Sequence, residues 1–304
     1  MKKSQPTTKK LEDTGERMIP SYHKGHLIYG EHIVRYESVE PFVKNKIVLD
    51  IASGSGYGTA KLAETAKHVT GVDLDSDAIA YASENYAAKN IEYKQGDGIH
   101  IPLTDNAIDT VVSFETIEHI EDYKQFLSEV KRVLKPEGTL VISSPNDLES
   151  PEGNHYHVHE FQFDELFKLL KAEFTYVQPH LQGTWLYTTV VSAKDAKGDW
   201  RQEIDTIGVS PLSKEKAMYF QFICSNEPIK QSLKIVGSVS EHWSVRSLQE
   251  HNEGVGYLIN QLKSTVKEQE SQIKKLTKEL ARVHNTLVWR IAKKAKAVKS
   301  IVVK

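Results

Sequence analysis

Two glutamates and a histidine lie close together in the segment ETIEH, residues 115–119. If this segment begins a helical turn, Glu115, Glu118 and His119 project from one face, because positions i, i+3 and i+4 are neighbours on a helix. Two carboxylates and an imidazole suit Mg²⁺ or Mn²⁺, and the imidazole favours Mn²⁺ or another transition metal. The spacing therefore predicts a metal site, to which His157 could add a fourth ligand.

The same residues allow two interpretations without a metal. In NHYHVHEF, His157 and His159 point the same way if the segment is extended. Either could act alone as a general base, because the ordinary pKa of histidine lies near neutral pH. Alternatively, Glu118 and His119 merely start a helix, with the histidine hydrogen-bonded. The catalytic candidates are Glu118, His119, His157 and His159.

A glycine-rich turn, VLDIASGSGYG at residues 48–58, indicates a second ligand site. A strand ending in Asp50 leads through three alternating glycines into a helix. Glycine lets the backbone approach a ligand without Cβ interference, and a helix N-terminus attracts negative charge. The next strand ends in GVDLD, where Asp73 can accept hydrogen bonds from both hydroxyls of a ribose, or can cap the following helix.

The elements that must position these residues alternate between strand and helix. Such units with short connections favour parallel pairing with right-handed crossovers. We therefore expect an α/β fold with a Rossmann-like, doubly wound, mostly parallel sheet, whose ligands bind beyond the carboxyl ends of the strands. The expected strands are 46–51, 68–73, 91–95, 110–114, 138–143 and 186–193, with 174–178 extended, and the expected helices are 58–66, 76–89, 123–134 and 164–172.

Four parts are expected along the chain: an N-terminal tail and helical cap (1–43), the Rossmann-like domain (44–195), an unassigned stretch (196–254) and a C-terminal coiled coil (255–304). The unassigned stretch could be an insertion on the acceptor side or a linker.

The coiled coil is predicted from apolar residues that alternate three and four apart. A single polar residue, Gln269, breaks this series and could help to fix register or oligomer state. The pattern favours a homo-oligomer, although an amphipathic helix packed on its own domain would look similar. The apolar positions are Ile259, Leu262, Val266, Ile273, Leu276, Leu280, Val283 and Leu287.

The last segment, WRIAKKAKAVKSIVVK at 289–304, has six basic residues and no acidic one. Such a helix can lie on an anionic membrane surface, dock a partner or simply end the coiled coil.

Composition excludes several classes of protein. Lys and Arg number 39 against 41 Asp and Glu, which excludes a globally basic nucleic-acid binder, and nucleic acid is not an expected partner. One cysteine excludes an intramolecular disulfide framework. No apolar run approaches the roughly 18 residues of a membrane span, and the basic N-terminus lacks the apolar core of a signal peptide. We expect a cytoplasmic protein, with a peripheral position at the inner face of the membrane left open.

Residues 46–145 resemble the class I S-adenosylmethionine-dependent methyltransferases. The glycine loop is GSGYG rather than the GxGxxG of dinucleotide dehydrogenases. GVDLD ends the second expected strand, QGD follows the third, and the fourth runs into SFETIEH. The resemblance implies S-adenosyl-L-methionine as cofactor, with Asp50 and the glycines around its methionine part, Asp73 at the ribose and Asp97 at the adenine. The expected cofactor-binding residues are Arg17, Asp50, Ala52, Gly54, Gly56, Gly58, Asp73, Leu74, Asp97, Gly98, Ser113 and Glu115.

A closer resemblance covers about residues 14–180. TGERMIP, EHIVRY, VVSFETIEHIED, SSPN and HVHEF are similar to a bacterial methyltransferase family of surface-polysaccharide gene clusters, often alongside or fused to glycosyltransferases. ARVHNTLVWRIAKKAK resembles the tails of some glycan-assembly glycosyltransferases. The implied activity is O-methylation of a sugar hydroxyl of a surface glycan or its precursor, with a glycosyltransferase as a further candidate partner. Arg17 belongs to the expected N-terminal cap and could pair with the carboxylate of S-adenosylmethionine.

The ExxEH pattern is also similar to that of metal-dependent ubiquinone-pathway and small-RNA 2′-O-methyltransferases, whose acceptors carry a catechol-like or vicinal diol. A bound cation would lower the pKa of an acceptor hydroxyl and hold two neighbouring hydroxyls. The alternatives are therefore a small-molecule diol, an RNA 3′ end, or a donor-binding scaffold without catalysis.

Overall fold

The chain forms two compact units in the computed structural model, Met1–Ser240 and Glu241–Lys304. The structure describes residues 11–12, 17–24, 26–146, 156–184, 211–237, 242–284 and 286–302. For residues 242–261, 287 and 297–302 it describes the backbone alone.

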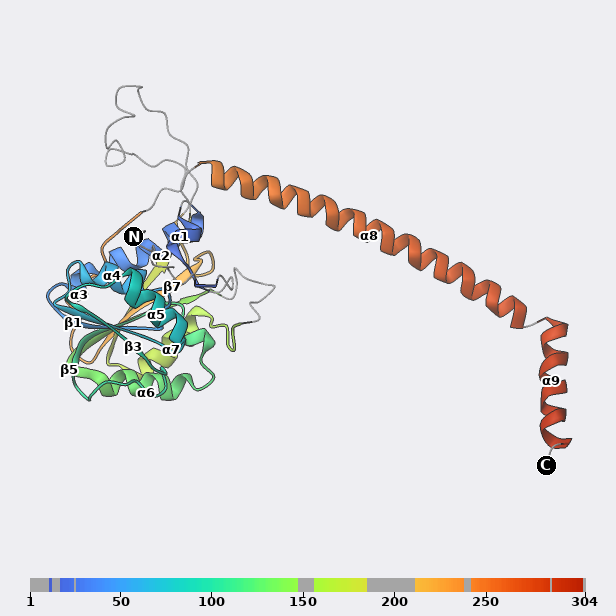
Figure 1. Cartoon of the computed structure of the whole chain (residues 1–304), viewed down its shortest axis with the longest axis horizontal. Helices are drawn as coiled ribbons and strands as arrows, with labels where there is room; N and C mark the ends of the chain where they lie inside the picture. The colour runs from blue at the N-terminus through green and yellow to red at the C-terminus, as the bar shows by residue number, and fades with distance from the viewer. Residues whose placement is uncertain are drawn as a thin grey trace, which may run out of the picture. The chain divides into compact units, whose positions relative to one another are not determined.

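The first unit contains a seven-stranded sheet in the order β3-β2-β1-β4-β5-β7-β6 (Figure 1). The first five strands in this order run parallel, and β7 is antiparallel to both β5 and β6. Strand order reverses between β1 and β4, so the loops after these two strands meet at the place where such sheets bind ligands. The strands are β1 (Ile47–Ile51), β2 (His68–Asp73), β3 (Ile91–Gln95), β4 (Ile108–Ser113), β5 (Leu134–Pro145), β6 (Tyr176–Gln182) and β7 (Tyr219–Ser225).

Helices cover both faces of this sheet, which explains why β1 and β2 are buried along nearly their whole length. On one face, Val48 and Val112 pack with Leu62 of α4 and Phe42 of α3. On the other face, α6 and α7 pack against the same central strands. The helices of this unit are α1 (Pro20–His23), α2 (Leu27–Ser38), α3 (Glu40–Val43), α4 (Tyr57–Ala63), α5 (Ser76–Asn85), α6 (Tyr123–Val133) and α7 (Phe163–Glu173).

Helix α6 shows how the sequence forms these layers. The Asp122 side chain accepts a hydrogen bond from the Gln125 backbone N–H at 2.9 Å and so caps the helix. Phe126, Val130 and Val133 follow at helical spacing and are buried. A polar cap followed by an apolar stripe both starts this helix and fixes the face that it turns to the sheet.

The predicted α/β fold is confirmed, with one strand added. Each of the five central strands lies where it was predicted to within a few residues, except that β5 starts four residues earlier, at Leu134. Strand β7 comes from the stretch that was left unassigned, and it pairs between β5 and β6. The strand predicted at 186–193 lies outside the described residues.

The second unit consists of two helices, α8 (His242–His284) and α9 (Leu287–Val302). Helix α8 begins 13 residues before the predicted start of the coiled coil at 255. Across the described part of the chain, every helix is too short or too polar to span a membrane.

Candidate functional site

The loop after β1 is held in an open, left-handed conformation. Ala52, Gly54 and Gly56 have φ values of +58°, +54° and +86°. The Ser53 N–H donates to the Val72 carbonyl of β2 at 3.0 Å, which ties the loop to the neighbouring strand. A Cβ added at Gly54 would meet no atom within 4 Å, whereas at Gly56 it would lie 2.5 Å from the Ala82 Cβ. The loop therefore packs on α5 through Gly56 and faces open space at Gly54.

Asp73 ends β2 beside this loop. Its carboxylate accepts hydrogen bonds from the backbone N–H groups of Gly54 at 2.7 Å and Asp75 at 2.9 Å. Asp75 caps helix α5, because its side chain accepts from the Asp77 N–H at 2.8 Å. The capping role considered for Asp73 therefore belongs to Asp75, and Asp73 joins the glycine loop to the end of β2.

Arg17 lies at the same strand end. Its Nη1 is 2.7 Å from Asp75 Oδ2 and holds the pKa of that carboxyl below its usual range, against the opposing effect of burial. The predicted pairing of Arg17 with a donor carboxylate stays a prediction, and in this structure its partner is Asp75.

Three further residues predicted to bind the cofactor, Leu74, Asp97 and Gly98, follow β2 and β3, and Asp97 is the one predicted at the adenine. Leu74 follows the buried strand β2 and exposes 68% of its surface. Asp97 accepts from the Ile99 N–H at 3.0 Å, and a Cβ at Gly98 would lie 3.1 Å from the Phe126 ring. An exposed apolar side chain and a nearby carboxylate offer a flat base one surface for stacking and one hydrogen-bond acceptor.

Asp50 is fully buried below the loop. Thr59 donates to Oδ2 at 2.6 Å and the Tyr36 hydroxyl donates to Oδ1 at 3.3 Å. Burial raises the pKa of Asp50 to about 7, although both hydrogen bonds oppose the rise. A Cβ at Gly58 would overlap the Tyr36 ring, so this glycine allows the tyrosine to reach Asp50.

Glu115 turns away from the predicted metal site. Its φ of +50° breaks the helical turn on which the prediction depended, and the short 3₁₀ helix begins only at Ile117. Glu115 Oε1 instead accepts from the Ser143 hydroxyl at 2.6 Å and lies 3.5 Å from Arg35 Nη1. The expectation that Glu115 shares a face with Glu118 and His119 is therefore wrong.

Arg35 is a residue that the sequence reasoning did not single out. Its side chain is completely buried, and its guanidinium lies 4.3 Å from the centroid of the Tyr219 ring. Nη1 also donates to Gln182 Oε1 at 3.4 Å, so α2, β6, β7 and the end of β4 meet at this group. The motif EHIVRY contained the arginine, but its partners on β6 and β7 could not be found without those strands.

Glu118, His119 and His157 come together at the end of β4. One ligand atom from each lies within 4.8 Å of the others. The N–H groups of Val158 and His159 donate to the Glu118 carbonyl at 2.8 and 3.1 Å, and so tie the two segments together. We call these three residues the Glu118 cluster.

Second partners orient both imidazoles of the Glu118 cluster. His119 Nδ1 lies 3.1 Å from the Tyr156 carbonyl oxygen, and His157 Nδ1 lies 3.2 Å from Glu160 Oε1. Both neighbours are hydrogen-bond acceptors, so each contact fits the tautomer that carries a proton on Nδ1. Metal-binding histidines usually have this arrangement.

His159 points elsewhere. Its Nε2 lies 2.8 Å from Glu165, and its ring packs on Phe161 at 4.3 Å. The segment is not a strand, so the expectation that His157 and His159 point the same way is wrong. The other predicted residue here, Ser113, has a buried hydroxyl without a hydrogen-bond partner among the described residues.

Comparison with known proteins identifies the domain type. Residues 49–142 match the family described as "Methyltransferase domain". The chain is 34% identical over 164 residues to a protein of Mycolicibacterium smegmatis named a probable S-adenosylmethionine-dependent methyltransferase, covering 52% of this chain and 63% of the relative. A protein of the same name from Mycobacterium tuberculosis is 35% identical over 162 residues, covering 52% and 58%. The chain thus spans about 60% of the length of these relatives.

A solved structure shares the fold. A S-adenosylmethionine-dependent methyltransferase from Thermotoga maritima superposes with a TM-score of 0.51 at 17% identity, covering 70% of this chain and 97% of that one.

Proposed function

We propose that this protein is an S-adenosylmethionine-dependent O-methyltransferase acting on a sugar hydroxyl of a cell-surface glycan or its precursor. Its class I catalytic domain would include residues 49–142, which match the methyltransferase-domain family. The observation that carries the proposal is the position of the Glu118 cluster, directly after β4 and beside the reversal of strand order. The choice of a sugar acceptor is supported by the sequence resemblance to the polysaccharide-associated family.

The loop after β1 and the ends of β2 and β3 fit the donor. Gly54 faces open space, the Asp73 carboxylate is fixed at the end of β2, and Leu74 presents an exposed apolar surface. Asp73 and Leu74 would hold the nucleoside half, and Gly54 and Asp50 would lie beside the methionine half. When bound, S-adenosylmethionine would supply the methyl group: an acceptor oxygen would bond to the methyl carbon in line as the carbon–sulfur bond breaks, and the neutral thioether S-adenosylhomocysteine would leave.

The Glu118 cluster suits a divalent cation. One buried carboxylate and two imidazoles form a mixed oxygen and nitrogen ligand set, which favours Mn²⁺ or another transition metal over Mg²⁺. A cation there would lower the pKa of an acceptor hydroxyl and hold neighbouring hydroxyls of a diol. Without a cation, His157 would be the general base, oriented by Glu160.

Arg35 positions Glu115 at the end of β4. The guanidinium is fixed by its stack on Tyr219 and its contact with Gln182, and it lies 3.5 Å from Glu115 Oε1.

Helix α9 gives the protein a means of working on lipid-linked material. Trp289 and Ile291 are exposed, and the described side chains around them include Arg290, Lys293 and Lys294. A cationic helix with exposed apolar residues binds anionic lipid surfaces. We infer a peripheral position at the inner face of the membrane.

The test uses S-adenosylmethionine with a labelled methyl group. The full-length protein is offered glycan, lipid-linked, small-molecule and RNA fractions of its host, each with Mn²⁺ or with EDTA. Label that enters glycan or lipid-linked material only with Mn²⁺ supports both the proposed sugar acceptor and the cation. Label that enters the same material in the presence of EDTA supports the sugar acceptor with His157 as the general base. Label confined to RNA or small molecules would refute the glycan acceptor. Donor binding without transfer to any fraction would instead identify a scaffold.

The cation has its own test, which does not depend on turnover. Mn²⁺ affinity is measured by calorimetry for the wild type, for His157→Ala and for the matched control His159→Ala. Binding that is lost in the first variant and kept in the second supports the site, and equal affinities in all three would refute it.

A further inference from the structure

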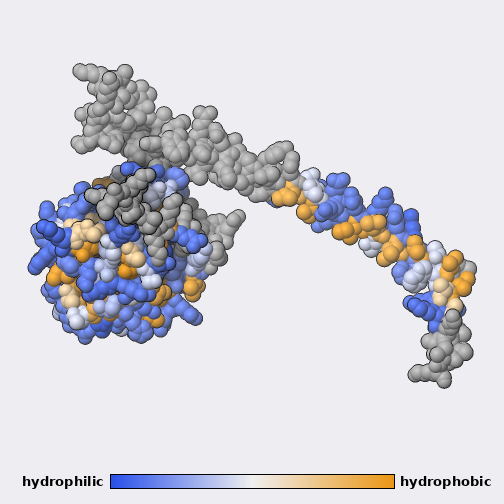
Figure 2. Space-filling model, viewed as in Figure 1, coloured by the Kyte–Doolittle hydropathy of each residue, from blue (hydrophilic) through white to orange (hydrophobic). Residues whose placement is uncertain are grey.

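Helix α8 carries an exposed apolar stripe along its described side chains. Each member of the stripe exposes between 51% and 64% of its surface, and Figure 2 shows hydrophobic patches in orange along the described part of the helix. Monomeric proteins rarely leave so long an apolar surface open to water. The stripe consists of Leu262, Val266, Ile273, Leu276, Leu280 and Val283.

We propose that α8 pairs in parallel with α8 of a second copy of this chain to form a two-stranded coiled coil. The alternating spacing of three and four residues places Val266, Ile273 and Leu280 at heptad position a. Position d is occupied by Leu262, Gln269, Leu276 and Val283. β-branched residues at a together with leucine at d favour parallel dimers over trimers and tetramers, and two of these three a residues and two of these four d residues fit that rule.

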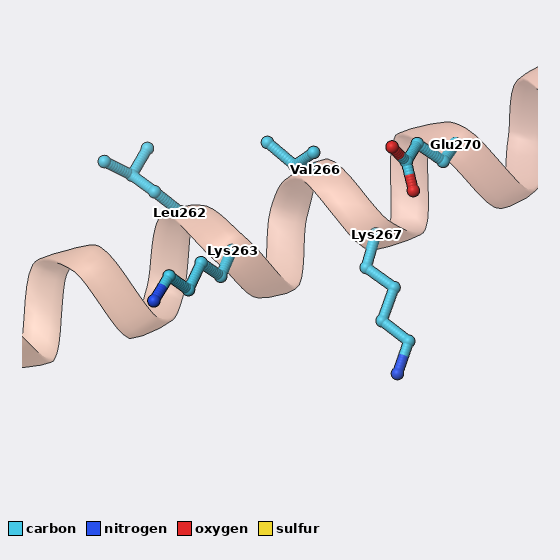
Figure 3. A pocket seen from close by; sticks show the side chains of 5 residues that line it. All are labelled: Leu262, Lys263, Val266, Lys267 and Glu270. Carbon is cyan, nitrogen blue, oxygen red and sulfur yellow. The ribbon is translucent and has the colours of Figure 1, made fainter.

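The surface of the helix already has the shape that such pairing needs. An open groove is lined by Leu262, Lys263, Val266, Lys267 and Glu270. Figure 3 shows Leu262 and Val266 projecting from the same side of the helix, with the two lysines directed away from them. Positions d, e and the next a, here 262, 263 and 266, form three sides of the hole that receives a d residue of a partner helix.

Gln269 argues for the parallel orientation. In a parallel, in-register pair, a d residue faces its own copy, so the two Gln269 amides can hydrogen-bond to each other. In an antiparallel pair a d residue faces an a residue, and all the described a residues are apolar. Gln269 would then be buried without a partner, which is unfavourable. A polar residue at one core position therefore selects both register and direction.

The flanking charges are compatible with the same arrangement. In a parallel dimer, each g residue lies next to the e residue five positions later on the other helix. The pairs are Thr265 with Glu270, Gln272 with Thr277, and Glu279 with His284. None of them joins like charges, and the last pair is attractive when the histidine is protonated.

The experiment is disulfide trapping in the full-length chain. The native Cys224 is fully buried, so an added cysteine on α8 reports with little background. Leu276→Cys places a thiol at a d position, where it faces its own copy in a parallel pair. Lys278→Cys, at the outward f position of the same turn, is the matched control. Under mild oxidation we expect Leu276→Cys to form a covalent dimer in most chains and Lys278→Cys to form at least tenfold less.

A second measurement covers the case in which the cysteine weakens the pair. Light scattering of the unmodified protein should give a mass twice the chain mass of 34.4 kDa. A monomer, a trimer or a tetramer would overturn the proposal. A dimer in which Leu276→Cys is not trapped would overturn the parallel orientation, because antiparallel helices do not bring a d residue against its own copy.

Discussion

We predict that the buried carboxyl of Asp50 makes donor binding depend on pH near neutrality. Burial raises its pKa to about 7, so at pH 6 most molecules carry it protonated and at pH 8 most carry it ionised. S-adenosylmethionine has a cationic sulfonium and a cationic ammonium in its methionine half. We therefore expect the ionised form of Asp50 to bind the donor more tightly.

The size of the effect follows from proton linkage. If the donor binds only the ionised form, the apparent affinity is proportional to the ionised fraction. For a pKa of about 7, that fraction rises about tenfold between pH 6 and pH 8. The effect of pH on folding stability has the opposite sign. Because the pKa of Asp50 is raised in the folded state, this carboxyl stabilises the folded state below about pH 4, and the contribution is lost as the pH rises through 7.

Calorimetric titration with S-adenosylmethionine at pH 6, 7 and 8 measures this dependence. The control is Asp50→Asn, which keeps the shape and the acceptor for Thr59 but cannot ionise. Nearby His32 does not interfere, because burial and the Arg35 charge lower its pKa well below 6.5. An affinity that stays flat across this range in the wild type, or an equal slope in Asp50→Asn, would refute the reasoning.

Four further changes test other parts of the structure. Arg35→Met leaves a carboxylate partner without its cation and should lower the free energy of unfolding by about 3 kcal/mol in urea titrations; an unchanged midpoint would contradict the ion pair. Gly58→Ala forces a methyl group into the Tyr36 ring and should cost about 1–3 kcal/mol, seen as a lower Tm. Glu160→Gln removes the charged acceptor of His157 Nδ1 and should weaken Mn²⁺ binding by about tenfold to a hundredfold in calorimetry. An unchanged Mn²⁺ affinity would show that the Glu160 carboxylate does not support the cation site. Deletion of α9 should abolish cosedimentation with phosphatidylglycerol vesicles while phosphatidylcholine vesicles stay unbound in both proteins.

The sheet could be predicted because its central strands are local signals. Val48–Ile51 and Val69–Val72 are short, mostly apolar runs, and each is followed by a turn and a helix. Strand β7 has a similar apolar run, but an unassigned stretch of sequence precedes it. Its place between β5 and β6 depends on long-range antiparallel pairing, which no local pattern specifies.

The candidate site shows the same contrast between local sequence signals and long-range contacts. The glycine loop and Asp73 were placed by spacing, because the chain brings them together over two adjacent strands. The ExxEH spacing assumed a regular helix from Glu115, and one left-handed residue was enough to turn that side chain to Arg35. Contacts across the sheet, such as Arg35 with Tyr219, required the fold itself.

The most direct test of the proposed function is the rate of labelled methyl transfer to the glycan fraction for three proteins. The wild type should transfer label, His159→Ala should retain most of that rate, and His157→Ala should lose at least tenfold, because only His157 joins the Glu118 cluster. Equal rates for the two variants, or no label in glycan from the wild type, would contradict the account.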